Sequence, residues 1–211
     1  MIPPLALEPK PHEMVLDMCA SPGSKTTQIA QYMKNTGLLI ANDFTGDRMK
    51  PLGINIQRMG MTNAILTKMY GQWFAKKDIV FDKILVDAPC SGTGTVRKSL
   101  KTLRMWNPIM IERLAATQKK LILTAFDILK PGGTMVYSTC STEPLENEGV
   151  VSYLLENRKA ELEEIEINLK KSEPIYEFER QKFNPEVKKV IRIWPQDNNT
   201  EGFFVAKIRK L

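Results

Sequence analysis

Residues 14–33 have the sequence MVLDMCASPGSKTTQIAQYM. The apolar run 14–18 predicts a short strand, and the helical spacing of apolar residues in 26–33 predicts a helix. The segment between them, 19–25, holds one proline and one glycine, which permit a tight turn and a close approach of the backbone to a ligand. A strand, a loop and a helix in this order favour an α/β fold.

The same alternation continues along the chain. Apolar runs predict further strands at 37–43, 62–68, 82–88 and 134–140, and amphipathic segments predict helices at 46–60, 108–129 and 144–157, with KPGG (130–133) as a turn. This order predicts a doubly wound, mostly parallel sheet with helices on both faces. From about residue 160 the apolar stretches follow one another without helices, so we expect edge strands in 160–211. We expect one domain over residues 1–211, with 1–12 as a lead-in.

Composition limits the function classes. The chain has 211 residues, 43% of them hydrophobic and 26% charged, as in ordinary globular proteins. No apolar run is long enough to span a membrane, and prolines interrupt the first eleven residues where a signal peptide is continuous. We therefore expect a cytoplasmic monomer that contacts no membrane. The net charge of +6 is compatible with a nucleic-acid partner but equally with none.

The three cysteines are Cys19, Cys90 and Cys140. Their odd number, their wide spacing and the absence of a Cys-x-x-Cys pair argue against a disulfide framework, and with His12 as the one histidine we expect no metal site. Cys90 and Cys140 stand in polar loops that follow two predicted parallel strands. Both loops should therefore lie at the edge of the sheet that also carries loop 19–25.

Two classes of nucleotide-like cofactor suit this layout. Asp43 ends the second predicted strand, where an acid can bind the two hydroxyls of a ribose. A dinucleotide needs a Gly-x-Gly-x-x-Gly loop, but only Gly23 is present here. S-adenosylmethionine has no phosphate and needs no such loop, so the sequence favours it, with a plain strand-to-helix turn as the structural alternative.

A thiol in a methyl-transfer site suggests a carbon acceptor. Carbon 5 of cytosine becomes nucleophilic after a thiolate adds to carbon 6, which is covalent catalysis. The thiol pKa must then fall from about 8.5, and a helix starting near Pro144 would help at Cys140. Asp87 could hold the nitrogen 3 edge of the base, and the second thiol could assist release. Spacing alone does not decide which of Cys90 and Cys140 is the nucleophile.

The chain resembles the RNA cytosine-C5 methyltransferase family, the NOL1/NOP2/Sun group. The resemblance is carried by VLDMCASPGSKTTQIA, ANDFTGDRM, KILVDAPCSGTGTVRK, the stretch from QKKL to EGVV, and IWPQDNNTEGFFVAKI. These motifs cover about residues 4–157 and 190–209, and the order DAPCSG then YSTCS is highly specific. The resemblance implies the fold described above, S-adenosylmethionine as cofactor, and 5-methylcytosine in tRNA or rRNA as the product.

The resemblance also implies roles at matching positions. Cys140 would be the nucleophile, Cys90 would assist breakdown of the adduct, and Asp87 would contact the base and the cofactor. Lys25 would reach both the cofactor and the active site. The remaining cofactor-binding residues would be those of the first loop, the acid of the second strand and a supporting arginine: Cys19, Ala20, Ser21, Pro22, Gly23, Ser24, Asp43 and Arg48.

The chain departs from the family in two places. Tyr70 stands about where members carry an acid near the adenine, so Tyr70 or backbone groups would serve that ring. Members usually carry an RNA-binding segment before the catalytic domain; we expect that segment to be absent here and RNA contacts to come from Arg97, Lys98, Lys101 and Arg104. A separately encoded RNA-binding partner is possible. The alternative function is a non-catalytic module that binds the cofactor and RNA.

Overall fold

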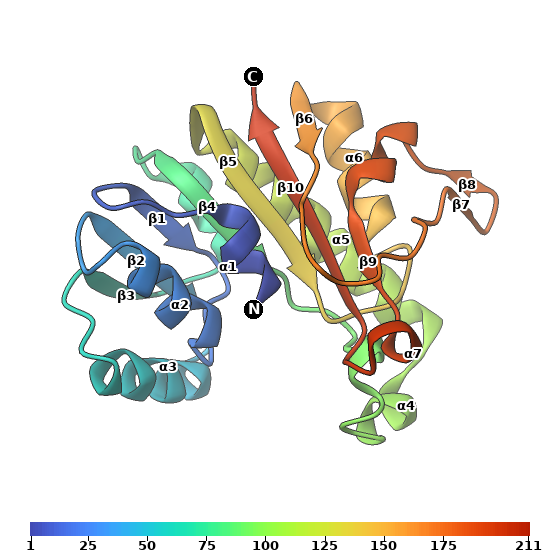
Figure 1. The fold of residues 1–211 in the computed structure, drawn as a ribbon, viewed down its shortest axis with the longest axis horizontal. Helices are drawn as coiled ribbons and strands as arrows, with labels where there is room; N and C mark the ends of the chain where they lie inside the picture. The colour runs from blue at the N-terminus through green and yellow to red at the C-terminus, as the bar shows by residue number, and fades with distance from the viewer. The chain divides into compact units, whose positions relative to one another are not determined.

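A mostly parallel sheet carries the helices of this protein, for which a computed structural model describes residues 1–211 (Figure 1). The strand order is β3-β2-β1-β4-β5-β10-β6, and β9 pairs with β10. Strand β1 pairs in parallel with both β2 and β4. The chain therefore reverses its direction of winding between β1 and β4, and ligands of such sheets bind beyond the strand ends at this point. The predicted α/β fold is confirmed.

The chain divides into two compact units, and the first comprises Met1–Asp87, Thr124–Val136 and Lys210. Its elements are α1 (Ile2–Leu7), β1 (Met14–Asp17), α2 (Ser24–Tyr32), β2 (Leu38–Asp43), α3 (Gly46–Arg58), β3 (Ala64–Lys68), the 3-10 helix η1 (Gly71–Lys76) and β4 (Phe81–Asp87). In the register of the parallel strands, Val15 of β1 lies beside Leu39 of β2 and Lys83 of β4.

The second unit comprises Ala88–Leu123, Tyr137–Arg209 and Leu211. The elements from residue 88 onwards are η2 (Thr93–Thr95), α4 (Lys101–Met105), α5 (Pro108–Asp127), β5 (Leu129–Thr139), α6 (Glu148–Asn157), β6 (Ala160–Glu163), β7 (Glu177–Phe178), β8 (Gln181–Lys182), η3 (Pro185–Lys189), β9 (Ile191–Ile193), α7 (Pro195–Asn198) and β10 (Phe203–Lys210). Strands β9 and β10 are antiparallel.

The core of the first unit explains why its strands are so apolar. Ile84, Leu85 and Val86 of β4 are fully buried. Helix α3 buries Leu52 and Ile56 against Ala20 and Ala41, which packs the helix beneath the loop after β1. Each fully buried aliphatic side chain of this kind contributes about 1.5–3 kcal/mol to folding. The core therefore holds the loop in place.

Several predicted boundaries differ from the structure. The lead-in forms helix α1, which buries Pro3, Pro4, Ala6 and Leu7. Residues 130–133, predicted as a turn, lie inside β5, where Gly132 has a φ of 75°. Of the edge strands expected in 160–211, β6 is short and runs over Ala160–Glu163. No helix here combines the length and the apolar character that a membrane crossing requires.

Candidate functional site

The loop after β1 is built around Gly23, the residue just before α2. Gly23 has a φ of +106°, which is in the left-handed region that glycine tolerates best, and a Cβ there would stand 3.0 Å from Leu52 Cδ1. The backbone can therefore turn sharply from the strand into the helix. The N–H of Ala20 donates to the carbonyl of Asn42 at 2.7 Å, which ties this loop to β2.

Asp43 and Arg48 both form hydrogen bonds with the backbone of Ser21 in this loop. The Ser21 N–H donates to Asp43 Oδ2 at 3.2 Å, and Arg48 Nη2 donates to the Ser21 carbonyl at 2.8 Å. Arg48 Nε also lies 3.3 Å from Asp43 Oδ2. Asp43 is buried at the end of β2, so its carboxylate is held rigidly beside the loop. The arrangement brings together three of the residues that the sequence analysis assigned to the cofactor.

Asp17, which the sequence analysis did not single out, is fully buried at the end of β1. Thr26 Oγ1 donates to its Oδ2 at 2.7 Å, whereas Oδ1 has no hydrogen-bond partner in the protein. Burial raises the pKa of Asp17 to about 7, against the lowering effect of the Thr26 hydrogen bond. Burial also raises the pKa of the Cys19 thiol far above its usual range, so Cys19 stays protonated. The sequence signal that could have identified Asp17 is an acid at the last position of a buried strand.

Lys25 and Asp87 form an ion pair in the first unit. Lys25 Nζ lies 2.6 Å from Asp87 Oδ2, and both side chains are partly buried. Lys25 comes from the second residue of α2 and Asp87 from the last residue of β4. The pair therefore joins the loop after β1 to the end of the neighbouring strand.

Three exposed aromatic rings follow β2 and β3. The Phe44 and Tyr70 rings are stacked with centroids 5.8 Å apart, and Trp73 meets Tyr70 edge-on at 5.2 Å. Phe44 directly follows Asp43, so a flat apolar surface adjoins the carboxylate. Asp43 can bind the hydroxyls of a ribose, and the aromatic rings can stack on a planar base. A ribose and a base together make up an adenosine, so these residues fit the adenosine part of S-adenosylmethionine. Tyr70 occupies the region in which the family resemblance led us to expect an acid.

The two thiols of the second unit meet. Cys90 Sγ and Cys140 Sγ are 3.2 Å apart, although the residues are fifty positions apart in the sequence. Neither cysteine forms a disulfide, and both are partly exposed. The loops that carry them are held together by the Gly94 N–H, which donates to the Cys140 carbonyl at 2.9 Å, and by the Thr142 N–H, which donates to Thr93 Oγ1. Two nucleophilic sulfurs therefore lie next to each other in the second unit.

The two thiols differ in their electrostatic surroundings. The pKa of Cys90 is raised well above its usual value, first by the hydrogen bond with Cys140, then by burial and by the negative charges of Cys140 and Glu146. Cys90 therefore keeps its proton at neutral pH. A protonated Cys90 can donate its S–H to Cys140 and so favours a negative charge on Cys140 rather than on itself.

A buried carboxylate, Glu146, joins both thiol loops. Its oxygens accept from the Ser91 N–H at 3.0 Å, from Gln118 Nε2 at 2.9 Å and from the hydroxyls of Ser91 and Ser141 at 2.5 Å. Ser91 and Ser141 each follow one of the cysteines. Hydrogen bonds to a charged group are worth about 1.5–3 kcal/mol each, so Glu146 fixes the loops relative to each other. Sequence reasoning missed this residue.

The helix after Cys140 differs from the prediction. It begins at Glu148 rather than at Pro144, because residues 144–147 form turns. Two acids of this stretch, Glu146 and Glu148, are buried and bound to other side chains. Glu148 pairs with the buried Arg192, whose Nη2 lies 2.5 Å from Glu148 Oε2. Arg192 Nη1 also donates to the Thr142 carbonyl at 2.9 Å and so supports the loop of Cys140.

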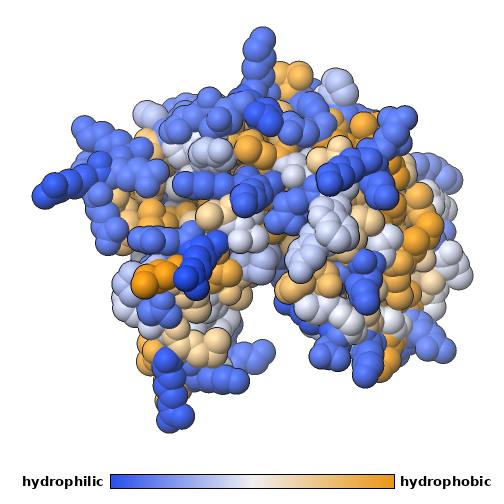
Figure 2. All heavy atoms as spheres, turned by 180° about the vertical axis from the view of Figure 1, so that it is seen from behind, coloured by the Kyte–Doolittle hydropathy of each residue, from blue (hydrophilic) through white to orange (hydrophobic).

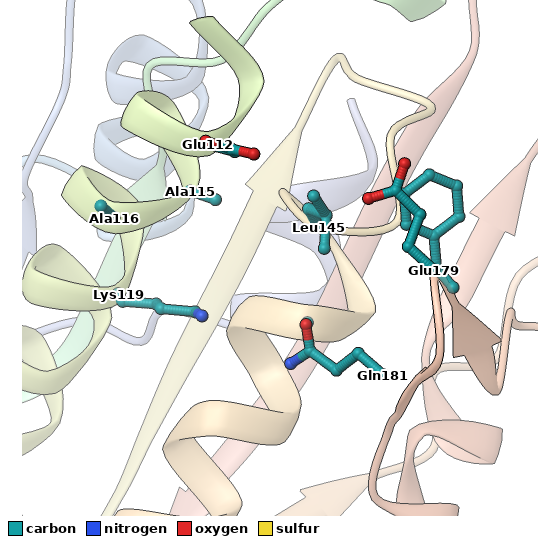
Figure 3. A pocket seen from close by; sticks show the side chains of 9 residues that line it. Glu112, Ala115, Ala116, Lys119, Leu145, Glu179 and Gln181 are labelled. Carbon is teal, nitrogen blue, oxygen red and sulfur yellow. The ribbon is translucent and has the colours of Figure 1, made fainter. Parts of the chain in front are cut away.

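A separate hollow of about 320 Å³ lies in the second unit (Figure 3). Its lining comes from α5, from the start of α6 and the turn before it, and from the β7–β8 hairpin: Glu112, Ala115, Ala116, Lys119, Leu145, Gly149, Phe178, Glu179 and Gln181. Neither cysteine is among these residues. The thiol pair and this hollow are therefore distinct features.

Comparison with known sequences gives matches along the whole chain. A family described as 16S rRNA methyltransferase RsmB/F matches residues 4–209. A protein from Pyrococcus abyssi named tRNA (cytosine(49)-C(5))-methyltransferase is 52% identical over 210 residues, which are 100% of this chain and 68% of that protein. A mouse protein named 28S rRNA (cytosine-C(5))-methyltransferase is 42% identical, and the match covers 100% of this chain but 27% of that protein.

Solved structures agree with these matches. The crystal structure of NSun6 from Pyrococcus horikoshii with SFG, an analogue of S-adenosylmethionine, superposes with a TM-score of 0.86 at 36% identity, over 99% of this chain and 50% of that one. A methyltransferase homologue from Pyrococcus horikoshii gives a TM-score of 0.82 at 38% identity, over 99% and 65% of the two chains. The present chain thus spans between about a quarter and two thirds of these relatives.

Proposed function

Since this chain belongs to the RsmB/F family of methyltransferases, we propose that it transfers a methyl group from S-adenosylmethionine to carbon 5 of a cytosine in RNA. The observation that carries the proposal is the pair of sulfurs 3.2 Å apart. One thiol suffices to attack carbon 6, and a second thiol beside it provides a group for release. Because the 52% identical relative is named for a tRNA position, tRNA is the first substrate to test and rRNA the second.

In this proposal the thiolate of Cys140 adds to carbon 6 of the ring. Asp87 holds the nitrogen 3 edge, where a proton stabilises the adduct. Bound S-adenosylmethionine supplies a methyl group on a positively charged sulfur. Carbon 5, now nucleophilic, takes that methyl group with the electron pair that the addition released, and the electrons of the broken sulfur–methyl bond stay on the sulfur, which leaves as a neutral thioether. Loss of the carbon 5 proton to a base then lets the bond between Cys140 and carbon 6 break, which restores the thiolate and the aromatic ring.

The interaction between the two thiols fixes the order in which Cys140 and Cys90 act. The two largest influences of Cys140 on Cys90, a hydrogen bond and a negative charge, both raise the Cys90 pKa. When Cys140 becomes a neutral thioether in the adduct, both influences weaken and the Cys90 pKa falls. Cys90 can then release its proton to solvent and accept the carbon 5 proton. The second thiol thus becomes a base after the adduct has formed.

RNA containing 5-fluorocytidine tests this function, because fluorine at carbon 5 cannot leave as a proton and the adduct persists. We expect the wild-type protein, with S-adenosylmethionine and a fluorinated tRNA transcript, to form a complex that survives a denaturing gel. Cys140→Ser should abolish the complex. Cys90→Ala should instead accumulate a complex even with unfluorinated RNA, because release fails.

The two variants serve as controls for each other, since each removes one sulfur from the same site. If the wild type binds RNA and S-adenosylmethionine but traps neither tRNA nor rRNA, the chain is the non-catalytic binding module. If Cys90→Ala releases RNA like the wild type, the role given to Cys90 is wrong. A complex that persists in Cys140→Ser would remove Cys140 as the nucleophile.

A further inference from the structure

Residues 97–109, which we name the α4 segment, expose several large apolar side chains to solvent. Helix α4 buries none of its side chains and stands out from its unit (Figure 1). Exposed large apolar side chains are usually scattered singly, and a run of them marks an interaction surface. In the α4 segment each of the following is between 46% and 68% exposed: Leu100, Leu103, Met105, Trp106 and Ile109.

The charge of the α4 segment identifies the kind of partner. Residues 97–109 contain four basic residues and no acid. Lys98, Lys101 and Arg104 are exposed, and none of them makes an ion pair. A surface that combines unpaired cations with apolar side chains is complementary to a nucleic acid, whose phosphates are negative and whose bases have apolar faces. Figure 2 shows that hydrophobic residues are interspersed with hydrophilic ones over one face of the protein.

The two ends of the α4 segment are anchored while its middle is exposed. Arg97 Nη2 donates to Asn199 Oδ1 at 2.7 Å, so Arg97 holds the segment rather than presenting a free cation. At the other end Trp106 Nε1 donates to Glu143 Oε1 at 2.9 Å, three residues after Cys140. Gly94, just before the segment, donates to the Cys140 carbonyl. The segment is therefore held at Trp106 to the stretch that follows Cys140, and at Arg97 to Asn199.

We propose, on the basis of the function proposed above, that the α4 segment separates the target cytosine from its neighbours in a paired RNA. Lys98, Lys101 and Arg104 contact phosphates, while Leu100 and Leu103 occupy the space that the displaced base leaves. Unstacking and unpairing a base cost a few kcal/mol, and apolar side chains inserted between bases offset part of this cost. The thiol loops then receive a base that is already exposed.

The test compares a paired and an unpaired target. A 5-fluorocytidine hairpin carries the modified cytosine in its stem, and the same strand without its complementary half carries it unpaired. We expect Leu100→Ser with Leu103→Ser to slow covalent trapping of the paired target at least about tenfold and to leave the unpaired target nearly unchanged, since only the paired target needs the wedge. Ile65→Ser, which removes a side chain 51% exposed in β3, is the matched control.

Each outcome decides one question. If the wild type traps neither RNA, the proposed function fails, whatever the α4 segment does. If the wild type traps both and the double variant traps both at wild-type rates, the wedge is refuted while the function stands. Equal slowing on both targets would refute the wedge, since the effect would not depend on pairing. A lowered melting temperature would then assign Leu100 and Leu103 to folding of the site, and an unchanged one to general contact with RNA. Binding of the segment to anionic lipid vesicles, with RNA affinity unaffected by its charges, would also overturn the proposal.

Discussion

At the scale of single residues, two buried carboxylates, Glu146 and Asp17, differ in the donors around them. Glu146 stays buried because Ser91, Ser141 and Gln118 supply donors to it. Burial raises the pKa of Asp17 to about 7, against the hydrogen bond from Thr26, which is its one side-chain donor. Glu146 and Asp17 are therefore similarly buried but have different roles. Glu146 fixes the two thiol loops, whereas Asp17 lies next to the loop after β1 with one oxygen that has no hydrogen-bond partner.

Asp17 makes stability depend on pH in a direction opposite to that of most acids. Its pKa in the folded protein, about 7, exceeds its value of 3.8 outside the fold, so the folded protein binds a proton that the unfolded chain releases. The stability that this proton provides is complete below the unfolded pKa and is lost as pH rises through the folded pKa. We expect Asp17→Asn to lose less stability than the wild type between about pH 5 and about pH 7.5.

Urea unfolding at the two pH values measures this difference, which cannot exceed about 4 kcal/mol for a shift of this size. Asp78→Asn, which changes an exposed acid in the loop before β4, is the matched control and should follow the wild type. Parallel pH profiles for the wild type and Asp17→Asn would show that Asp17 is ionised throughout this range.

At the scale of elements, three backbone segments meet at Gly94. Its N–H donates to the Cys140 carbonyl, and its own carbonyl accepts from the Gly202 N–H at 2.8 Å. A Cβ on residue 94 would stand 2.4 Å from the Gly202 carbonyl oxygen and 2.7 Å from that of Cys140. Backbone cannot yield as a flexible side chain can, so the loop of Cys140 would have to move.

We therefore expect Gly94→Ala to destabilise the protein by about 1–3 kcal/mol, as overpacking does, and to slow covalent trapping of fluorinated RNA. Thermal unfolding and the trapping rate measure the two effects. Gly46→Ala is the control, since a Cβ on residue 46 meets nothing within 4 Å. Wild-type trapping by Gly94→Ala would mean that the thiol loops tolerate displacement.

The elements also show what the sequence could predict. Continuous apolar runs identified the parallel strands, because a strand buried on both faces needs apolar side chains throughout. The meeting of Cys90 and Cys140 followed from placing both after parallel strands. Glu146 could not be predicted, because its partners come from three separate segments and an acid before a helix has an ordinary explanation in the helix dipole. The boundary of β5 was wrong because Gly132 allows the strand to continue through a sequence typical of a turn.

At the scale of the whole molecule, binding to RNA should weaken with salt. The chain carries 30 Lys and Arg against 24 Asp and Glu, a modest excess, so attraction depends on where the cations lie. If Lys98, Lys101 and Arg104 each neutralise a phosphate, log K should fall against log salt with a slope of about −2 to −3. Fluorescence anisotropy with a labelled single strand measures this slope.

Lys98→Gln should then reduce the slope by about 0.7, whereas Lys10→Gln, near the N-terminus, should leave it unchanged. A slope near zero for the wild type would mean that RNA affinity comes from stacking and hydrogen bonds instead. Equal effects of the two substitutions would mean that the attraction is spread over the whole surface rather than concentrated in the α4 segment.

The interleaving of the two units has a consequence for synthesis. The first unit needs residues 124–136, yet all of 88–123 belongs to the second unit and leaves the ribosome earlier. Neither unit can be completed as a contiguous piece of nascent chain. Strands β1 to β4 find one another within residues 1–87, but the other edge of β4 must wait for β5, which is made later. At a synthesis rate of about 5–20 residues per second that edge of β4 stays unpaired for several seconds, and unpaired strand edges of this kind promote aggregation.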